Sequence, residues 1–484
     1  MAVRLADLAA AIGRVPVAGW DEIAITDITE DSRHVGPGAL FVAVPGMVYD
    51  GADFLEEAVD RGAAAVVSQT DRETRVPNLR IEDPRAALAG LAAAFYGQPT
   101  ESLFAVGVTG TNGKTTVCRW IAHLLGDDRT TVIGTVANEA RGLRAVTTPS
   151  SPTVQRIAAD ARDSGDANLV VEASSVGLMQ HRLDAVAFDA AVFTNLSHDH
   201  LDLHRTMDAY LDAKRILFRD LRAEAHAVVN ADDRASEGIL VGCPAETVRY
   251  GFSVDTELRA TRPAYAARET RCTIAWRGES APLRLPHPGV HNLANALAAA
   301  AVALLRGDAL DGVAERLGGA PAVDGRLQFF SRDDGLLAVV DFAHTPDSLK
   351  RALEVVRPPE GRRIVVFGCA GEADPAKRPA MGEIAGRLAD WAIVTTDNPK
   401  HEAPTAICDE IEVGLRRTGE RWERVLDRAE AVARAVDLAR PGDVLLVAGK
   451  GHERYQIVDG VFVPYSDHAE LERLGFVEDT RSAA

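Results

Sequence analysis

The chain has 484 residues, of which 46% are hydrophobic and 26% are charged. That length is too great for one core and predicts roughly two to four domains. The formal net charge is −18, from 53 basic and 71 acidic residues. A charge of this sign argues against nucleic acid and against an anionic membrane as partners, because no general positive field attracts phosphate groups.

The cysteines and the hydropathy of the chain argue against secreted, zinc-binding and membrane proteins. The five cysteines are widely spaced and none belongs to a CxxC pair, which argues against a disulfide framework and a zinc cluster. Residues 1–15 carry too short an apolar run for a signal peptide. No stretch of about 18 uncharged apolar residues could span a membrane. We therefore expect a cytoplasmic protein without membrane contacts.

Residues 1–102 predict a mixed α/β N-terminal domain. Short β-like runs such as residues 40–44 are separated by Gly and Pro, and an alanine-rich helix is predicted around residues 86–96. The stretch 97–100, Gly-Gln-Pro-Thr, is typical of a linker that ends this domain.

Residues 103–321 predict a central α/β domain with a parallel sheet. A Gly-rich turn and a helix from about 113 to 125 follow its first strand. Helical patterns lie between some of the later strands, which is typical of a parallel sheet. A more β-rich insertion is expected at about 247–287. The predicted strands of the sheet are 103–108, 131–136, 168–173, 190–194 and 226–230.

Residues 322–484 predict a Rossmann-like C-terminal domain, in which an apolar strand followed by a polar loop recurs four times. The loops read DFAHTPD, GCAGEADPAKRP, TTDNPKHE and AGKGHERYQ. Because ligands bind beyond the carboxyl ends of parallel strands, we expect these loops to meet at one edge of the sheet. The predicted strands are 337–340, 364–367, 392–394 and 444–447.

The turn at residues 107–116, Gly-Val-Thr-Gly-Thr-Asn-Gly-Lys-Thr-Thr, predicts a phosphate-binding loop. Backbone N–H groups of such a loop and the following helix N-terminus bind phosphate oxygens. Lys114 can reach the β- and γ-phosphates, and Thr115 can ligate Mg²⁺. The loop is a variant, because the usual first glycine position holds Val108 and a glycine lies one residue earlier. The alternative is an ordinary glycine-rich turn.

Two strand ends in the central domain carry candidate metal ligands. Glu172 ends an apolar strand in the same domain as the phosphate loop, where a carboxylate can hold Mg²⁺. A surface carboxylate is an equally good interpretation of this feature alone. His198, Asp199 and His200 follow the strand 190–194 and could serve a metal or an acyl phosphate, although a lone histidine is more often structural.

Lys214 lies on the apolar face of a helix predicted around residues 207–218. It shares this face with Tyr210, Leu217 and Phe218 at helical spacing. A lysine in such a place is costly unless it is paired or chemically altered. A lysine whose stem is buried and whose charge reaches solvent is the simpler explanation.

Taken together, these residues resemble the Mur ligase family, of the MurE type that adds an amino acid to UDP-N-acetylmuramoyl-L-Ala-D-Glu. The resemblance covers nearly the whole chain and rests on the order and spacing of short motifs. Besides the phosphate loop, Glu172, His200 and Lys214, they are Asp31-Ser32-Arg33, Thr147-Thr148-Pro149, Ser174, Gln180-His181-Arg182, Gly289-Val290-His291-Asn292, Gly325-Arg326, Asp341-Phe342-Ala343-His344, Lys377-Arg378-Pro379 and Gly449-Lys450-Gly451-His452-Glu453.

The resemblance implies that ATP and Mg²⁺ are required. It implies catalytic roles for Lys114, Lys214 and His200. The metal ligands would be Thr115, Glu172, His200 and Lys214, the last as a carbamate, which converts the cation into an anion. The implied ATP-binding residues are Gly110, Thr111, Asn112, Gly113, Lys114, Thr115, Thr116, Asn295, Arg326, Asp341 and His344.

The resemblance also assigns substrates to the three domains. The N-terminal domain would bind the UDP part of the acceptor, the central domain ATP, and the C-terminal domain the amino acid. We expect a monomer whose domains close around these small molecules. The implied substrate-binding residues are Ser32, Arg33, Thr147, Thr148, Ser174, Gln180, Arg182, Asp397, Asn398, Lys400, Gly449 and Glu453.

The implied chemistry needs no side-chain nucleophile. The γ-carboxylate of the acceptor attacks the γ-phosphate of ATP, and the amine then displaces phosphate from the acyl phosphate. Mg²⁺ and Lys114 offset charge on the phosphoryl oxygens. Catalysis is therefore expected to be mainly positioning and electrostatics, in peptidoglycan precursor synthesis.

Several positions depart from the family pattern. Ala373 and Lys400 stand where arginines help to hold the incoming amino acid, and lysine lacks the bidentate fork that suits a carboxylate. Val176 replaces a usual histidine, Tyr49 a small or polar residue, and His468 an arginine. These departures suggest the hypothesis that the amine is not ordinary meso-diaminopimelate.

Other interpretations stay open. Drift is one, with nearby basic residues such as Arg378 supplying the missing charge. A Mur-like ligase of a specialised pathway, with another acceptor or amine, is a second. Folylpolyglutamate synthases share the central chemistry but lack a first domain of this type. A non-catalytic ATP-binding protein is disfavoured, because Thr115, Glu172, His200 and Lys214 are all present.

Overall fold

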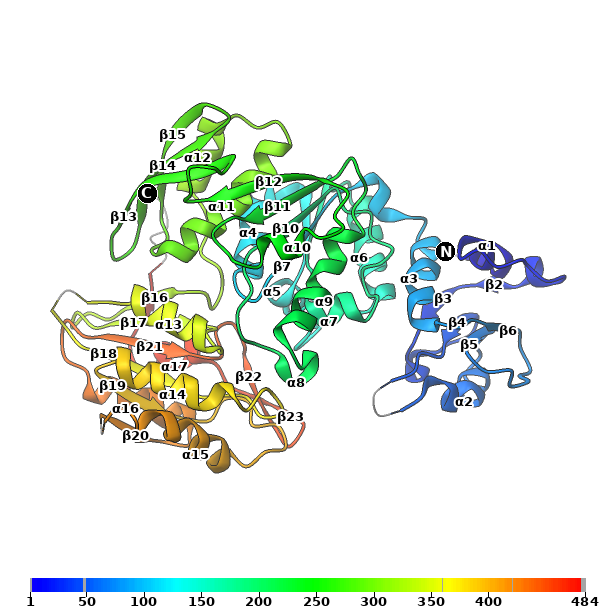
Figure 1. Ribbon diagram of the computed structural model, residues 1–484. Helices are drawn as coiled ribbons and strands as arrows, with labels where there is room; N and C mark the ends of the chain where they lie inside the picture. Colours follow the sequence, from blue (N-terminus) through cyan, green and yellow to red (C-terminus); the bar gives the residue numbers. More distant parts are fainter. Residues whose placement is uncertain (1, 47–48, 359, 420, 480–484) are drawn as a thin grey trace.

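The protein is described by a computed structural model for residues 2–46, 49–358, 360–419 and 421–479. The chain forms three α/β domains in sequence order, each on its own sheet (Figure 1). The N-terminal domain projects from one side of the central domain, and the C-terminal domain lies below it on the other side. Among the described helices, none is long and apolar enough to cross a lipid bilayer.

The N-terminal domain is a four-stranded parallel sheet covered by helices on both faces. The strands lie in the order β3-β4-β5-β6. Leu40 and Val42 face one core with the helices α1 and α3, whereas Phe41 faces another with α2, as the alternation of a strand requires. The elements are β1 (Val3–Arg4), α1 (Leu5–Ala11), β2 (Ala24–Ile25), β3 (Asp27–Thr29), β4 (Ala39–Val42), α2 (Leu55–Asp60), β5 (Ala65–Ser68), β6 (Asn78–Arg80) and α3 (Pro84–Phe95).

The central domain is a nine-stranded sheet in the order β15-β14-β13-β12-β11-β10-β7-β9-β8. One core lies between the sheet and the helices α4, α11 and α12, and the other contains residues of α6, α7 and α9. The elements are β7 (Phe104–Thr109), α4 (Lys114–Leu125), β8 (Thr130–Ile133), α5 (Thr135–Ala140), α6 (Ser151–Asp163), β9 (Asn168–Glu172), α7 (Ser175–Met179), β10 (Ala190–Phe193), α8 (Leu201–His204), α9 (Met207–Arg219), β11 (His226–Asn230), α10 (Ser236–Ile239), β12 (Glu246–Gly251), β13 (Leu258–Tyr265), β14 (Thr270–Trp276), β15 (Glu279–Leu285), α11 (Val290–Leu305) and α12 (Leu310–Gly318).

The β-rich segment at 247–287 is not a separate insertion. Its strand β13 pairs in parallel with β12, and β14 and β15 add antiparallel strands to the same sheet. Cys272, Ile274 and Trp276 belong to the core beneath α11. The β-rich character predicted there was therefore correct, but the segment is part of the central sheet and one of its faces is buried.

One predicted strand, 131–136, was too long. The strand β8 ends at Ile133, and α5 begins at Thr135. Glu172 determines this boundary, because its Oε1 accepts the backbone N–H of Thr135 at 3.0 Å. Gly134 is needed for this approach, because a Cβ there would meet the Glu172 carboxylate.

The C-terminal domain is a seven-stranded sheet in the order β20-β19-β18-β21-β17-β16-β24. Its strands β20 to β17 are parallel, and β16 and β24 are antiparallel additions. The elements are β16 (Gln328–Ser331), β17 (Leu337–Asp341), α13 (Pro346–Val355), β18 (Arg363–Phe367), α14 (Lys377–Leu388), β19 (Trp391–Val394), α15 (Pro404–Leu415), β20 (Trp422–Arg424), α16 (Arg428–Leu438), β21 (Val444–Ala448), β22 (Tyr455–Val458), β23 (Val461–Pro464), α17 (Asp467–Arg473) and β24 (Val477–Glu478).

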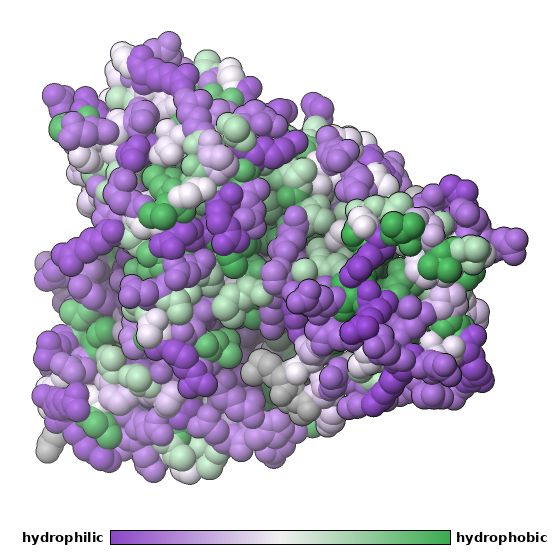
Figure 2. Space-filling model, turned by 45° about the vertical axis from the view of Figure 1, so that its right-hand side comes forward, coloured by the Kyte–Doolittle hydropathy of each residue, from purple (hydrophilic) through white to green (hydrophobic). Residues whose placement is uncertain are grey.

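The four polar loops of this domain do follow neighbouring parallel strands. The strands β17, β21, β18 and β19 are adjacent in the sheet, so the loops after them lie along one edge. This edge faces the phosphate loop of the central domain, because Asp347 of α13 accepts a hydrogen bond from Asn112 at 3.0 Å. In the space-filling view the visible face is mostly hydrophilic, and several apolar residues lie in its recessed central part (Figure 2).

Candidate active site between the central and C-terminal domains

A cavity of about 310 Å³ lies between the central and C-terminal domains. Its walls combine the phosphate loop, strand ends of the central sheet, the start of α11, and the loop after β17. Most of the residues predicted to bind ATP and Mg²⁺ line it, namely Thr111, Asn112, Gly113, Lys114, Thr115, Thr116, Glu172, His200, Asn295, Arg326, Asp341 and His344.

The turn at 110–113 joins a buried strand to a helix, as predicted. Gly113 has φ +89°, and a Cβ there would meet the side-chain amide of Asn295 from α11, so glycine is required on both counts. Lys114, the first residue of α4, folds back over the loop and donates to the carbonyls of Gly110 and Thr111, each at 2.9 Å. Burial lowers the pKa of Lys114, and a phosphate in the loop would favour its charged form.

Glu172 points at the phosphate loop. It is 2% exposed, which rules out the surface-carboxylate interpretation. Thr115 Oγ1 donates to Glu172 Oε2 at 3.1 Å. Burial raises the pKa of Glu172, and the charge of Lys114 opposes that shift. A buried carboxylate beside a threonine hydroxyl is the oxygen-rich environment that Mg²⁺ prefers.

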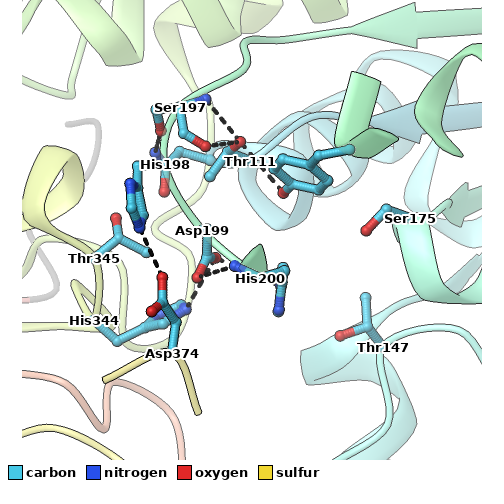
Figure 3. Close-up of polar contacts among 12 residues, drawn as sticks. Thr111, Thr147, Ser175, Ser197, His198, Asp199, His200, His344, Thr345 and Asp374 are labelled. Atoms are coloured by element: carbon cyan, nitrogen blue, oxygen red, sulfur yellow. Dashed lines mark hydrogen bonds and ion pairs between the residues drawn. The ribbon is translucent and has the colours of Figure 1, made fainter. Parts of the chain in front are cut away.

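His200 lies on the opposite wall, at the start of α8. Its neighbour Asp199 is buried, and Asp199 Oδ2 lies 3.5 Å from His200 Nε2. Figure 3 shows both side chains near Thr111, with Thr147 and Ser175 on the other side of His200. Among the described residues no group of three or more His, Cys, Asp or Glu side chains could hold a metal. A cation at Glu172 and His200 therefore fits only with further oxygen ligands.

Lys214 is 1% exposed on α9, so its charge does not reach solvent. Its Nζ donates to the Gly110 carbonyl at 3.0 Å and lies 4.2 Å from the centre of the Tyr210 ring. Burial, reinforced by the charge of Lys114, holds the pKa of Lys214 well below its usual value. The explanation in which the charge of Lys214 reaches solvent is therefore wrong.

The C-terminal domain contributes an arginine to this cavity. Arg326 Nη2 donates to Thr115 Oγ1 at 3.2 Å, and its guanidinium lies 4.3 Å from the centre of the Phe342 ring. Asp341 shapes this loop by accepting the N–H groups of Leu327 and Ala343 at 2.7 and 2.8 Å. Arg326 thus reaches from the C-terminal domain to Thr115 of the central domain, the threonine predicted to ligate Mg²⁺.

The residues predicted for the acceptor form a separate group at the edge of this cavity. Thr148 Oγ1 donates to the Glu172 carbonyl at 2.7 Å and lies 2.9 Å from Ser174 Oγ. Arg182 donates to the Thr148 carbonyl and to Gln180 Oε1, both at 2.5 Å. Thr147 lines the cavity itself.

Ser32 and Arg33 lie apart from these residues, on the N-terminal domain. Ser32 is buried, whereas Arg33 is exposed and its Nη2 lies 2.7 Å from Asp31 Oδ2. Hydrogen bonds from Arg33 lower the pKa of Asp31 to about 2. The structure thus shows that Arg33 pairs with Asp31, and neither Ser32 nor Arg33 lines the cavity.

The residues predicted for the amino acid surround a buried lysine. Lys450 is 0% exposed, and its Nζ donates to Asn398 Oδ1 at 2.9 Å and to Glu453 Oε2 at 2.7 Å. Asn398 in turn donates to Glu453 Oε2 at 2.9 Å. Asp397 lies 3.9 Å from the Lys450 amine. Gly449 precedes this lysine with φ +114°.

Sequence reasoning missed several residues of these sites. Thr135, Asn195, Phe342 and Arg351 line the cavity. Phe342 stood inside a motif already singled out, so its position at a strand end was a usable signal. Thr135 and Asn195 follow strand ends too, whereas no local pattern marks Arg351 on α13.

Comparison with known families decides the class of the chain. A model of the Mur ligase middle domain matches residues 108–303, one of the Mur ligase, glutamate ligase domain matches residues 325–451, and one of the Mur ligase family, catalytic domain matches residues 24–96. A Chlorobaculum tepidum protein named UDP-N-acetylmuramoyl-L-alanyl-D-glutamate--2,6-diaminopimelate ligase is 41% identical over 97% of this chain and 96% of its own. The chain belongs to the Mur ligase family.

Further relatives agree with this membership. A ligase of the same name from Bacillus licheniformis is 37% identical to this Mur ligase and covers 98% of it, over 100% of its own length. A solved structure of a ligase with that name has a TM-score of 0.68 at 30% identity and covers 98% of both chains. A Mycobacterium tuberculosis folylpolyglutamate synthase has a TM-score of 0.60 at 20% identity over 74% of this chain and 91% of its own, which shows a shared fold only.

The structure locates the departures from the family pattern. Lys400 has φ +54°, and its Nζ lies 3.4 Å from the Glu372 carbonyl. Arg378 does not supply the charge that Ala373 lacks, because it is buried and its guanidinium bonds Glu402 at 2.9 Å and Glu410 at 3.2 Å. That part of the drift explanation is wrong.

The other departures lie elsewhere. His468 is buried and its Nε2 lies 2.7 Å from Gln328 Oε1. Tyr49 is exposed on the N-terminal domain and packs edge-on against Phe54. Val176 lies in α7, next to the acceptor residues. The departures that lie near the residues predicted for the amino acid are therefore Ala373 and Lys400.

Proposed function

We propose that this Mur ligase joins meso-diaminopimelate to UDP-N-acetylmuramoyl-L-Ala-D-Glu at the expense of ATP, in peptidoglycan precursor synthesis. The observation that carries the proposal is the cavity in which Lys114, Glu172 and Arg326 meet from two domains. Relatives with high coverage bear the name of this reaction. We place the protein in the cytoplasm as a monomer, in line with small soluble substrates.

ATP would lie across the cavity, with its phosphates at the loop 110–116. Lys114 and the N-terminus of α4 favour the β- and γ-phosphates. Asn295, beside Gly113, would contact the base of the nucleotide. Arg326, Asp341 and His344 complete the nucleotide site from the C-terminal domain.

Mg²⁺ would be held by Thr115, Glu172 and His200. When bound, it offsets charge on the phosphoryl oxygens. Phosphate oxygens and water would supply other ligands, and one further anionic group from the protein would strengthen the site. Lys214 fits this need as a carbamate, since its buried amine, with a lowered pKa, can add CO₂.

The proposed reaction depends on where the acceptor, ATP and the amine would be held. The γ-carboxylate of the acceptor, held near Thr147, Thr148, Ser174, Gln180 and Arg182, attacks the γ-phosphorus and ADP leaves. The amine attacks the acyl carbon, phosphate leaves, and the amine proton passes to solvent or phosphate. Lys114 and Arg326 stabilise the transferring phosphoryl group, which is an electrostatic role. The UDP part would reach Ser32 and Arg33.

The amine would lie among Asp397, Asn398, Lys400, Gly449 and Glu453. Its positive amino group suits Glu453, whose carboxylate is oriented by Asn398 and Lys450. Lys400 is a half-buried cation in this group, and its Nζ donates to the Glu372 carbonyl at 3.4 Å. It therefore offers one carboxylate of diaminopimelate a charge partner, although without an arginine's fork.

A panel of amino acids tests this function. Purified protein with ATP, Mg²⁺ and the UDP-muramoyl dipeptide should release phosphate with meso-diaminopimelate, and mass spectrometry should show the tripeptide product. Release with a different amino acid would support the altered-amine hypothesis that Ala373 and Lys400 raised. No release with any amino acid, from protein that binds ATP, would favour a specialised ligase with another acceptor.

A further inference from the structure

The two loops that meet between the nucleotide and amine sites contact each other through charged side chains. We define loop A as residues 197–200, after β10, and loop B as residues 371–377, after β18 and at the start of α14. His198 of loop A and Asp374 of loop B bond across the domain boundary, with 2.7 Å between Nε2 and Oδ2 (Figure 3). The carboxylate can only accept, so the imidazole N–H donates.

Loop A is tied to the phosphate loop. Ser197 N donates to Thr111 Oγ1 at 3.0 Å, and Asn112 Nδ2 donates to Ser197 Oγ at 3.4 Å. Asp199, which is buried, lies 3.9 Å from Lys377 at the C-terminal side of the boundary. A shift of loop A would therefore be felt at Thr111 and Asn112, both of which line the nucleotide cavity.

Loop B is tied to the amine site. Gly371 N donates to the Asn398 carbonyl at 2.9 Å, and the Lys400 amine lies 3.4 Å from the Glu372 carbonyl. Asp374 fixes the shape of loop B, since its Oδ1 accepts the N–H of Ala376 at 2.9 Å. Loop B therefore supports Asn398 and Lys400, the residues that would hold the amino acid.

We propose that His198 is a positioning residue that couples the amine site to the nucleotide site through its bond to Asp374. The proposal rests on the ligase function above and adds a regulatory link to it. With the bond made, the docked C-terminal domain presents loop B and the amine residues in one arrangement relative to the phosphate loop. Because coupling is reciprocal, nucleotide and acceptor then strengthen amine binding, and amine favours the closed state.

The coupling protects the acyl phosphate. If loop B is free to move while the nucleotide side is intact, the acyl phosphate forms but the amine is poorly placed, and water takes its place. Water attack gives back the carboxylate and releases phosphate, so ATP is consumed without an amide. His198 would thus keep phosphate release and amide formation at equal rates.

Three variants and a control test the proposal. His198→Ala removes the bond from a half-exposed side chain, His198→Gln keeps an N–H donor, and Asp374→Asn keeps the Ala376 cap through Oδ1. We expect His198→Ala and Asp374→Asn to raise KM for the amino acid about 10-fold and to raise phosphate released per amide above one. ATP binding without amine should weaken less than amine binding does, and His198→Gln should restore most of the loss.

Arg268→Ala is the matched control. It removes another bond between the same two domains, from Arg268 before β14 to Asp479, far from the amine loops, and should change neither KM nor the phosphate-to-amide ratio. An unchanged ratio and KM in His198→Ala would overturn the proposal, as would equal effects of Arg268→Ala. The double variant His198→Ala with Asp374→Asn should be no worse than either single one.

A second measurement does not depend on turnover. Hydrogen exchange with Mg²⁺–ADP bound should slow at residues 371–377 of the wild-type protein and remain fast there in His198→Ala. Equal protection in both proteins would contradict the coupling even if the amino acid were misassigned. Absence of amide in the wild-type protein, with normal protection, would instead count against the proposed function alone.

Discussion

At the scale of single residues, Lys214 shows how burial can define chemistry. An amine enclosed by apolar side chains and a carbonyl is favoured in its neutral form. The alternative interpretations of Lys214, Glu172 and His200 could be separated only by their depth and partners. Sequence patterns identify such residues, but only the packing of α9 against the phosphate loop shows that Lys214 has no route to solvent.

Replacing Lys214 tests the carbamate. Lys214→Ala should lower kcat by on the order of 100-fold or more, because an anion that supports phosphoryl transfer is lost. Added acetate or propionate should restore part of the activity by occupying the vacated space. Lys350→Ala, at an exposed lysine that pairs with Glu354, should have no effect. Steady-state rates that do not fall in Lys214→Ala would remove the carbamate from the account.

Replacing Glu172 distinguishes an effect on metal binding from an effect on the stability of the fold. Its pKa is raised by burial, so its charge costs stability above the usual carboxyl pKa, and Glu172→Gln should leave the unliganded protein at least as stable. In wild-type protein, Mg²⁺ with ADP should raise Tm beyond ADP alone. Glu172→Gln should abolish that additional shift in a thermal-unfolding assay, and an unchanged shift would place the metal elsewhere.

Lys400 is the test of amine recognition. Lys400→Met should raise KM for diaminopimelate about 10-fold or more, since a charged hydrogen bond is worth about 1.5–3 kcal/mol. Lys400→Arg should keep or lower the wild-type KM, because its fork fits a carboxylate. KM values for ATP serve as the internal control. A KM for diaminopimelate that Lys400→Met leaves unchanged would show that another group binds the carboxylate.

At the scale of elements, a buried ion pair holds the end of β21. Arg428 at the start of α16 bonds Asp467 at the start of α17 through two contacts of 2.8 Å, and both side chains are 0% exposed. Arg428 also donates to the Ala448 carbonyl at 2.9 Å. The pair thereby anchors the strand end that leads directly into Gly449 and Lys450.

Breaking this pair should destabilise the domain. Arg428→Met leaves a buried carboxylate without its cation and should cost about 3–5 kcal/mol in urea unfolding. Arg434 lies on the same helix as Arg428 and forms a partly exposed pair with Glu423 of β20. Arg434→Met removes this pair and should cost under about 1 kcal/mol. Equal losses in the two variants would contradict the anchoring role.

The same pair predicts a pH dependence. Burial alone would raise the pKa of Asp467, but the charge and hydrogen bonds of Arg428 keep it below its usual value. A lowered carboxyl pKa adds stability above the unfolded-state value of about 3.9 and loses it as pH falls through the folded-state value. The stability gap between wild type and Asp467→Asn should therefore be largest near neutral pH and shrink toward acid.

Most elements could be predicted from the sequence, and the errors have physical causes. Strand–loop–helix order predicted the parallel sheets and the meeting of the four C-terminal loops. The overlong strand at 131–136 failed because a distant residue, Glu172, caps α5 at Thr135. The segment 247–287 could be recognised as β-rich, but its pairing with β12 is a long-range contact that no local pattern contains.

The candidate site residues also fall into those that the sequence could predict and those that depend on long-range contacts. Residues of the phosphate loop could be assigned from spacing, since their function is local. Arg378 could not be judged from its charge, because only the fold shows that Glu402 and Glu410 neutralise it. Lys450 was within a quoted motif, yet its role as the buried centre of the amine residues depends on Asn398, 52 positions away.

At the scale of the whole molecule, the three domains place unlike chemistries side by side. The central and C-terminal sheets present their carboxyl edges to each other, so residues of both domains line the cavity between them. The bonds Asn112–Asp347, Arg326–Thr115 and His198–Asp374 all cross that boundary. Closure of these domains is therefore part of building the active site.

The central claim is that an acyl phosphate links ATP to the new amide, and isotope transfer tests it most directly. Acceptor labelled with ¹⁸O in the γ-carboxylate of its glutamate would be incubated with ATP, Mg²⁺ and diaminopimelate, and the phosphate analysed by mass spectrometry. The account predicts one ¹⁸O in each phosphate released per amide formed. Amide formation accompanied by unlabelled phosphate would contradict it.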